Sequence, residues 1–405
     1  MEHAGVHGAL IQTPIERALR APGPKRILAC DGGGVLGVMS IEILARLEAE
    51  LRRAHGGGEG YVLADFFDLV CGTSNGAILA ACIAAGFSMG EIRAFYVASA
   101  PHMFDPASLT NRLRYKYADE PLARRLQTLF DQRVLSAGEA GPVRLGDPRL
   151  RCLLMMVLYN YNTDSAWPVT NNPLAKFNDR ARDDTNLELP LWQLVRASAA
   201  SPGYFPPEEV MLGRERPYRY VFVDGAITSY NNPAFLAFQM ATAPAYRVNW
   251  PTGLDKLLLV SVGRIPCQDR NLLLQRQDLN LWHFAQRVPL AVINAATCSW
   301  DMACRTVGHC VFGPVLDEEV GTMAHSESAG STGQCFSYVR YAPDTAQTHL
   351  DELGLSHLLS ADYRVMDAVH RIPQLLEIGA AYAARNVRLE HVHDFIHTQP
   401  VRTTS

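Results

Sequence analysis

The amino-acid sequence predicts an α/β protein with a mostly parallel central sheet and helices on both of its faces. Short apolar runs that end in glycine alternate with helical patterns between residues 25 and 263, a rhythm typical of βαβ units. Apolar residues make up 48% of the 405 residues and charged residues 19%, which suffices for an ordinary core. We therefore expect a three-layer sandwich, followed by a mainly helical C-terminal portion.

The first predicted elements follow from the apolar pattern. Residues 1–24 are expected to form an irregular lead-in, because they end in the turn-forming sequence Ala21-Pro22-Gly23-Pro24. The apolar run 26–30 then predicts a buried parallel strand. Apolar residues spaced by three or four positions predict an amphipathic helix across residues 41–51. A second strand at 66–71 and a second helix at 77–85 complete the first repeat of the pattern.

Three later apolar runs predict further buried strands, at residues 152–159, 220–223 and 256–262. We therefore assign residues 25–264 to one α/β catalytic unit. Residues 88–135 are polar and helical in pattern, and we expect them to form a cap over a site. Residues 265–405 carry few strand signals beyond 335–341 and are expected to be a mainly helical extension.

Charge and cysteine content exclude several classes of protein. Lys and Arg number 37 and Asp and Glu 41, so the net charge of −4 lacks the basic excess of a nucleic-acid binder. Nine cysteines without a C-x-x-C pair indicate neither a zinc site nor a disulfide scaffold. The first 25 residues have no apolar leader pattern, and the apolar stretch 76–87 is too short to cross a bilayer. We expect a cytoplasmic protein.

The sequence Gly72-Thr73-Ser74-Asn75-Gly76 is the strongest chemical motif of the chain. It follows a predicted strand and precedes a predicted helix, which is where a G-x-S-x-G sequence acts as a nucleophile elbow. The sharp turn lifts the serine hydroxyl above the sheet, and the glycines on either side keep the approach open. The N-terminus of the following helix favours developing negative charge. Ser74 is therefore the candidate nucleophile, with Gly72 and Gly76 as its supports.

A glycine-rich loop at residues 31–37 forms the second motif, again between a strand and a helix. Gly32, Gly34 and Gly37 satisfy the dinucleotide-binding pattern G-x-G-x-x-G. That function would require an acidic residue at the end of a second strand about 20 positions later, and Glu48 and Glu50 lie inside a predicted helix instead. We therefore favour an oxyanion hole, because consecutive glycines let backbone N–H groups approach an anion closely.

The third motif is Asp224-Gly225-Ala226, which follows the apolar run 221–223. An Asp at the C-terminal end of a strand lies at the edge where open α/β sheets place their sites. Taken alone, Asp224 serves equally well as a turn or helix-capping residue. Together with Ser74 and the glycine loop it predicts one site at one rim of the sheet.

These three motifs resemble the patatin-like phospholipase family, whose pattern has a D-G-G-G-x-x-G loop, a G-x-S-x-G elbow and a D-G-[GA] motif in that order. The stretch 196–207, Arg-Ala-Ser-Ala-Ala-Ser-Pro-Gly-Tyr-Phe-Pro-Pro, also resembles the family's segment before the Asp strand. The resemblance spans about residues 25–263, and the remainder resembles an extension found in some bacterial members. Many members carry Arg or Lys where this chain has Leu36, so a contact of that cation near the glycine loop is missing here.

The resemblance implies a serine lipid acyl hydrolase of the phospholipase A type. Ser74 would attack the ester carbonyl and Asp224 would take its proton, without a histidine. N–H groups of Gly33 and Gly34, with Gly32 as a third donor, would hold the oxyanion, and Gly37 and Gly225 would support the loop and the Asp motif. The substrate would be a phospholipid or related acyl lipid, and the family requires neither a metal nor another cofactor.

Two other functions remain open from the sequence. A Ser-His-Asp hydrolase would add a later histidine, such as His283 or His309, to Ser74 and Asp224. An inactive relative would keep the loop and the elbow as a binding scaffold. Residues 111–133 carry a local charge of +3 with two tyrosines, Tyr115 and Tyr117, so this segment is a candidate for peripheral membrane contact.

Overall fold

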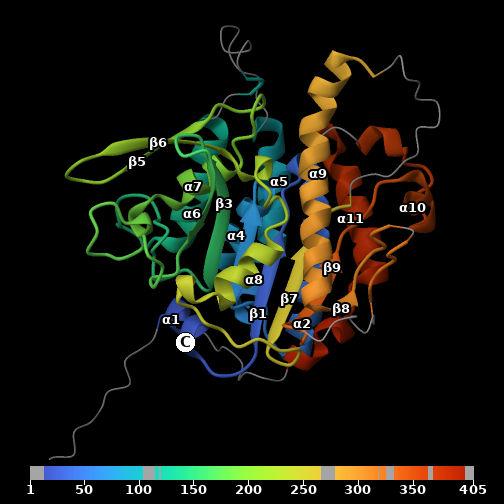
Figure 1. Ribbon diagram of the computed structural model, residues 1–405, viewed down its shortest axis with the longest axis horizontal. Helices are drawn as coiled ribbons and strands as arrows, with labels where there is room; N and C mark the ends of the chain where they lie inside the picture. Colours follow the sequence, from blue (N-terminus) through green and yellow to red (C-terminus); the bar gives the residue numbers. More distant parts are fainter. Residues whose placement is uncertain are drawn as a thin grey trace, which may run out of the picture.

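The computed structural model describes residues 13–103, 115–117, 120–265, 279–317, 319–324, 333–363 and 368–396. Its centre is a nine-stranded sheet between layers of helices (Figure 1). The strands are β1 (Lys25–Cys30), β2 (Leu69–Thr73), β3 (Leu153–Asn160), β4 (Ser165–Thr170), β5 (Glu208–Leu212), β6 (Tyr218–Asp224), β7 (Leu257–Val262), β8 (His309–Phe312) and β9 (Ser337–Tyr341). This is the α/β sandwich that the sequence predicts.

The sheet is mostly parallel. β3, β2, β1, β7, β9 and β8 lie side by side in that order, and each neighbouring pair is parallel. β4, β5 and β6 add antiparallel pairs on and beyond β3. The strands β1, β2 and β7 are buried along their whole length, as expected for parallel strands with helices on both faces.

Helices cover the two faces unequally (Figure 1). They are α1 (Pro14–Arg20), α2 (Met39–Ala54), α3 (Leu63–Phe66), α4 (Asn75–Ala84), α5 (Met89–Met103), α6 (Glu120–Val134), α7 (Leu191–Ser198), α8 (Ala234–Thr242), α9 (Leu281–Val307), α10 (Gln347–Glu352) and α11 (Ile372–Asn386). α4 and α7 pack on β3 and on each other, and α2, α5, α6 and α11 pack in the same layer. α8 and α9 pack together on the opposite face, over β1, β7 and β9.

The spacing of apolar residues explains α2, the first helix after the glycine loop. Ile41, Leu44, Leu47 and Leu51 are all fully buried, so the predicted apolar face is the face that packs. Most predicted strands are confirmed within a few residues. The strand predicted from residue 66 begins at Leu69 instead, because Phe66 ends the short helix α3. The strands β4, β5 and β8 were not predicted.

The two ends of the chain differ from the prediction in part. Residues 14–20 are helix α1 rather than irregular, because Thr13 and Glu16 form a reciprocal capping box at its start. Residues 1–12 lie outside the described residues. The C-terminal portion is mainly helical, and it also adds β8 and β9 to the sheet beside β7. Within the described residues, no helix is long and apolar enough to cross a bilayer.

The end of β2 is the point where two strands meet. β2 pairs with residues 153–157 of β3, and β6 pairs with residues 158–160. β4 occupies the other edge of β3 along residues 155–160. Since a strand has only two edges, β6 lies on the same edge as β2 and runs toward it. The end of β6 therefore arrives where β2 ends, and this places the site.

Candidate active site

Ser74 lies in a sharp turn between β2 and α4, as the elbow motif predicts. Its φ of 56° is a left-handed value that side chains other than glycine rarely adopt. Close packing holds this strained turn in place. A methyl group on Gly76 would lie 2.1 Å from the carbonyl oxygen of Cys30, so only glycine lets α4 begin this close to β1.

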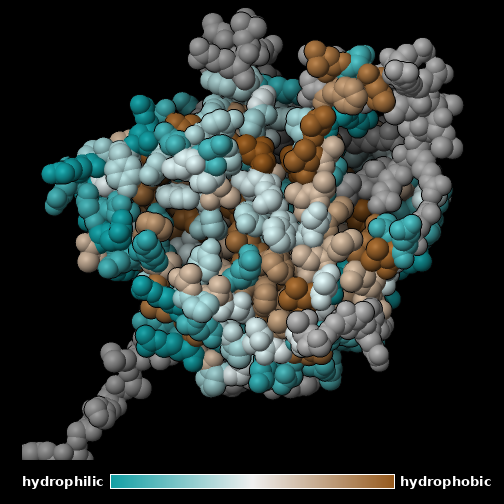
Figure 2. Space-filling view, in the orientation of Figure 1, coloured by the Kyte–Doolittle hydropathy of each residue, from teal (hydrophilic) through white to brown (hydrophobic). Residues whose placement is uncertain are grey.

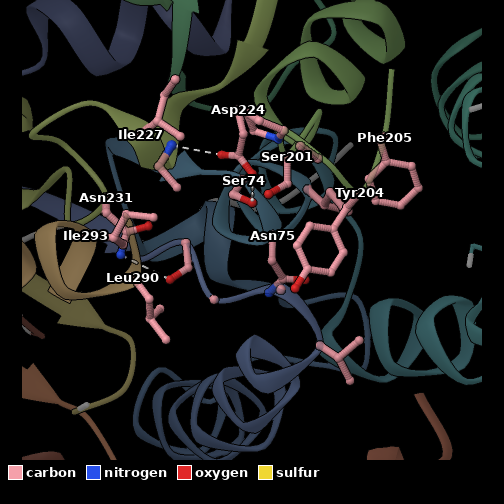
Figure 3. Close-up of a pocket in the computed structure, with 18 of the residues that line it drawn as sticks. Ser74, Asn75, Ser201, Tyr204, Phe205, Asp224, Ile227, Asn231, Leu290 and Ile293 are labelled. Carbon is pink, nitrogen blue, oxygen red and sulfur yellow. Dashed lines mark hydrogen bonds between the residues drawn. The ribbon is translucent and has the colours of Figure 1, made fainter. Parts of the chain in front are cut away.

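Ser74 and Asp224 are in direct contact. The Ser74 hydroxyl donates a hydrogen bond of 2.7 Å to Oδ2 of Asp224 (Figure 3). Asp224 lies at the end of β6, and its partner in the sheet is Leu158 of β3. The prediction that both residues share one rim is therefore confirmed, although β6 is not one of the parallel strands. β6 is antiparallel to β3 and meets β2 end to end, so its C-terminal end reaches this rim from the opposite side.

The Asp224 carboxyl is almost completely buried and makes two hydrogen bonds. Oδ2 accepts from Ser74, and Oδ1 accepts from the N–H of Ala226 at 2.8 Å. Burial raises the pKa of Asp224 to about 7, even though both hydrogen bonds lower it. A carboxylate with a pKa in this range can accept a hydroxyl proton near neutral pH.

The glycine loop faces Ser74 and presents two backbone donors. Gly32, Gly33 and Gly34 all line the cavity in front of Ser74. The N–H of Gly32 donates a hydrogen bond of 3.0 Å to the backbone carbonyl oxygen of Asn231, so it is not free to donate to a bound anion. Within the described part of the chain, the N–H groups of Gly33 and Gly34 donate to no other residue. This geometry favours Gly33 and Gly34 as anion donors and gives Gly32 a structural role.

The remaining predicted glycines mark close backbone contacts. A methyl group at any of four positions would lie within 2.2 Å of a neighbouring atom: Gly37, Gly72, Gly76 and Gly225. At Gly37 the neighbour is the side chain of Asn75, and at Gly225 it is the carbonyl oxygen of Val157. These glycines therefore bring the loop, the elbow and the Asp strand together, and none of them has a reactive group.

Arg340 is a buried partner of the glycine loop that the sequence did not indicate. It lies on β9 and makes two hydrogen bonds, of 2.9 and 2.5 Å, to the carboxylate of Asp31, the first residue of the loop. Burial raises the pKa of Asp31 and the Arg340 guanidinium lowers it. Leu36 is itself buried. Although this position carries no cation, Arg340 places a positive charge beside the loop.

Three further side chains hold the site and were also missed. Ser198, at the end of α7, accepts the N–H of Ser74 at 3.0 Å and donates to the carbonyl oxygen of Val157 at 2.7 Å. Thr297 of α9 accepts a 2.8 Å hydrogen bond from the side chain of Asn231. Tyr96 of α5 donates a 2.7 Å hydrogen bond to the side chain of Asn75. Ser198 lies in the stretch 196–207 that resembles the family, but nothing in that stretch indicated its contact with Ser74. Tyr96 and Thr297 lie outside the motifs, so spacing alone could not reveal them.

Ser74 opens into a cavity of about 480 Å³ whose walls are mostly apolar. In Figure 3, Leu290 and Ile293 of α9 lie on one side of Ser74, and Tyr204 and Phe205 lie on the other. Tyr96 of α5 and Leu122 of α6 also line the cavity. An apolar cavity with a serine at its floor suits a substrate with a hydrocarbon chain beside an ester.

Histidine is absent from the described lining of the cavity. His309 lies on β8, four strands away from β2 in the sheet. At about 4.8 Å per strand this places it roughly 19 Å away. The side chain of His283 lies outside the described residues. Asp224 occupies the position beside Ser74 that a histidine would need. Within the described residues, no group of His, Cys, Asp and Glu side chains has the arrangement of a metal site.

Comparison with known proteins gives a family match and several relatives. Residues 28–238 match the family model described as patatin-like phospholipase. Patatin-17 of Solanum cardiophyllum is 28% identical over 252 residues, and patatin group A-3 of Solanum tuberosum is 29% identical. Each match covers 58% of this chain and 59% of the relative. The chain thus spans about three fifths of the length of the curated relatives it matches.

Solved structures give weaker likenesses. VipD from Legionella pneumophila has a TM-score of 0.34 and 13% identity, covering 88% of this chain and 67% of that chain. A chain of the ExoU-SpcU complex from the type III secretion system of Pseudomonas aeruginosa has a TM-score of 0.28 and 20% identity. That match covers 46% of this chain and 38% of the other. Scores this low carry no conclusion about fold or function.

Proposed function

The chain belongs to the patatin-like phospholipase family, and from this premise we propose that it is a serine lipid acyl hydrolase that cleaves ester bonds of phospholipids or related lipids. One observation carries the proposal. The Ser74 hydroxyl donates directly to the buried carboxylate of Asp224 at 2.7 Å, at the floor of an apolar cavity. A nucleophile, a base and a place for an acyl chain therefore lie together.

The proposed reaction has two halves. Ser74 Oγ attacks the ester carbonyl carbon while its proton passes to Oδ2 of Asp224. The N–H groups of Gly33 and Gly34 stabilise the tetrahedral oxyanion, and losing one such donor typically raises the barrier by about 3 to 4 kcal/mol. Collapse breaks the ester C–O bond, and Asp224 returns the proton to the leaving alcohol. Water then attacks the acyl-enzyme, and its proton returns to Ser74 through Asp224.

The environment of Asp224 supports this role. A solvent-exposed Asp has a pKa of about 3.9 and is a weak base, whereas burial raises the pKa of Asp224 to about 7. The same burial excludes water from the Ser74 hydrogen bond and strengthens it. We propose that Ser74 and Asp224 act as a dyad, with the glycine loop as the oxyanion hole.

Helices α5 and α6 are proposed as the cap of the site. Tyr96 and Leu122 extend from them into the cavity, so α5 and α6 close one of its sides. Residues 104–114 and 118–119 of this segment lie outside the described residues. The assignment of residues 25–264 as the catalytic unit and the cytoplasmic location both stay predictions from the sequence.

Defined phospholipid vesicles incubated with the wild type and with Ser74→Ala test the proposal. We expect mass spectrometry to find free fatty acid and lysophospholipid with the wild type only. A fluorophosphonate probe should label the wild type and not the Ser74→Ala variant. A lipid product that persists in Ser74→Ala would contradict Ser74 as the nucleophile. Loss of activity in a histidine variant, with full activity in Asp224→Ala, would contradict the dyad and favour a Ser-His-Asp enzyme.

A further inference from the structure

Helix α9 carries a stripe of large apolar side chains on the surface of the protein. The stripe consists of Leu281, Phe284, Val288 and Val292, whose exposed fractions run from 47% to 86%. At about 100° per residue, these four positions fall within an arc of about 80° on one side of the helix. Figure 2 shows brown side chains along the upper half of α9. A contiguous apolar stripe of this kind indicates an interaction surface.

The α9 stripe is continuous with the wall of the active-site cavity. Pro289, Leu290 and Ile293 line that cavity, and on the helix they occupy the arc next to the stripe. One helix thus has an apolar face that runs from solvent into the cavity that contains Ser74. A hydrocarbon chain could move along this face without crossing a polar rim.

The upper half of α9 also projects beyond the rest of the fold (Figure 1). Pro289 lies inside the helix, where it removes one backbone hydrogen bond. Residues 281–300 contain no Asp or Glu and a single Arg, Arg287, so this segment meets no repulsion from anionic headgroups. A projecting apolar helix with a cation and no acid suits the interface of a bilayer.

The opposite rim of the cavity carries a second cation and aromatic rings. Lys116 is exposed and lies over the ring of Tyr204, and the backbone N–H groups of Lys116 and Tyr117 donate to residues 203 and 204. Tyr204 lines the cavity. Positive charge and aromatic rings thus lie across the cavity from Leu290 and Ile293 of α9, an arrangement that suits anionic headgroups.

The basic segment 111–133 offers fewer cations for membrane contact than its local charge of +3 indicates. Arg124 pairs with Glu120 and Arg133 with Glu91, while Arg112 and Arg114 lie outside the described residues. The cations of α6 are therefore partly neutralised within the protein. This shifts the expected membrane contact from residues 111–133 as a whole to α9 and the rim at Lys116.

We propose that the α9 stripe inserts into the surface of a phospholipid bilayer, so that the active-site cavity opens onto the membrane and takes its substrate from there. The proposal rests on the proposed lipid acyl hydrolase function. It assigns α9, which lies outside the matched family region, the role of delivering the substrate.

Vesicle sedimentation with a stripe variant tests this proposal. The variant replaces all four stripe residues by glutamine, a residue that helices tolerate well: Leu281→Gln, Phe284→Gln, Val288→Gln and Val292→Gln. Ser74→Ala is added for the binding measurements, so that the vesicles stay intact. Vesicles of phosphatidylcholine, alone and mixed with phosphatidylglycerol, are the probes. We expect binding to fall at least about tenfold, because the apolar area that enters the bilayer is lost.

A matched control removes four exposed apolar side chains elsewhere: Tyr161→Gln, Met211→Gln, Val315→Gln and Leu359→Gln. Their exposed fractions are similar, from 53% to 61%, so a general loss of surface hydrophobicity is equal in both variants. We expect the control to bind vesicles like the wild type. For the activity measurements the stripe variant keeps Ser74. It should then lose hydrolysis of vesicle phospholipid, while its rate on a short-chain p-nitrophenyl ester should stay within about twofold of the wild-type rate.

Two results would overturn the proposal. One is vesicle binding by the stripe variant equal to that of the wild type. The other is a wild-type dimer in sedimentation velocity that the stripe substitutions dissociate, because a second copy would then cover the stripe. If the wild type binds vesicles through the stripe but hydrolyses neither substrate, the proposed function fails while the docking surface stands.

Discussion

Residues 28–238 and residues 279–396 contribute to the same cavity in different ways. The first region supplies the groups that we propose to react, namely Ser74, Asp224 and the N–H groups of the glycine loop. The second supplies a buried cation behind the loop, Arg340, and an apolar wall from α9. The family motifs therefore mark the groups proposed to react, whereas the cation beside the loop and one apolar wall of the cavity come from a part of the chain without a recognisable motif.

Two buried carboxyls of the first region, Asp224 and Asp31, differ in their partners. Asp224 is a buried carboxyl with no cation among its hydrogen-bond partners, so burial works against its charge. Asp31 is buried too, but Arg340 is its partner through two hydrogen bonds. Burial makes the Asp224 carboxylate more basic, whereas the Asp31 carboxylate is paired with a cation. We therefore expect substitution of Asp224 to reduce activity first, and substitution of Arg340, which the second region supplies as the partner of Asp31, to reduce stability first.

Asp224→Asn is expected to have the largest effect on activity. Asn cannot accept the Ser74 proton, and removal of a general base typically lowers the rate by about 10²- to 10⁴-fold. Initial-rate kinetics on a soluble ester measure this loss. Fluorophosphonate labelling reports whether Ser74 keeps its reactivity. A variant that retains more than about a tenth of the wild-type kcat would contradict the role of Asp224 as base.

The same substitution should stabilise the fold above neutral pH. Since burial raises the pKa of Asp224 from 3.8 to about 7, the native state holds this proton more tightly than the unfolded chain. The stability that the group contributes is present below pH 4 and is lost as the pH rises to 7. Urea denaturation of Asp224→Asn should match the wild type at pH 4 and exceed it at pH 8 by at most about 4 kcal/mol.

Arg340→Met is expected to have the largest effect on stability. It leaves the Asp31 carboxylate buried without its partner, and breaking a buried ion pair typically costs about 3 to 5 kcal/mol. Urea denaturation of Arg340→Met, Asp31→Asn and the double variant gives the coupling free energy of the pair. The double variant should recover part of the loss. Equal stability of Arg340→Met and the wild type would show that the second region does not support the loop.

The next largest expected effect is that of pH on kcat. Only the carboxylate form of Asp224 can take the Ser74 proton, so kcat should rise with pH and level off above about pH 7. Below that value the rate should fall about tenfold per pH unit, as the carboxyl becomes protonated. Initial rates between pH 5 and pH 9 measure the profile. A plateau that extends down to pH 5 would mean that Asp224 ionises like an exposed carboxyl.

The sequence was sufficient to predict the class of fold and to select Ser74 and Asp224, which the structure brings into contact. Ser74 and Asp224 lie in local patterns whose chemistry depends on adjacent residues, and β1 and β2 are marked by continuous apolar runs. The direction of β6 was not predictable, because an apolar run reads the same in a parallel and in an antiparallel strand. Its antiparallel direction appears only in its pairing with residues 158–160 of β3, on the edge that β4 leaves open.

The residues that support the glycine loop could not be predicted from the sequence, because they lie far from it along the chain. Arg340 is 309 residues away from its partner Asp31 in the sequence, and Asn231 is 199 residues away from Gly32. Their pairing depends on how the sheet is assembled, and no local spacing records it. The prediction of three oxyanion donors included Gly32 for the same reason, since the carbonyl oxygen of Asn231 that accepts its N–H was unknown. The sequence predicted a mainly helical C-terminal portion but not that one side of α9 faces the cavity and another faces solvent.

Thr297→Val should give the smallest effect of the series, and it measures how far the second region reaches into the chemistry. The Thr297 hydroxyl accepts a hydrogen bond from the side-chain amide of Asn231. The backbone carbonyl oxygen of Asn231 in turn accepts a hydrogen bond from the N–H of Gly32. Valine keeps the shape and removes the hydroxyl, so we expect a loss of about 1 kcal/mol in stability. A small displacement of the loop should lower kcat a few-fold.

Thr306→Val is the matched control for this substitution. Thr306 lies on the same helix and, like Thr297, donates its hydroxyl proton to the carbonyl oxygen four residues earlier, at 2.8 Å against 2.9 Å. Thr306 is exposed, and the hydrogen bond of its hydroxyl stays within α9, so its valine variant should keep kcat. If both variants lowered kcat equally, the effect would belong to the helix itself. If Thr297→Val alone lowers kcat, the C-terminal region positions the oxyanion loop as well as stabilising it.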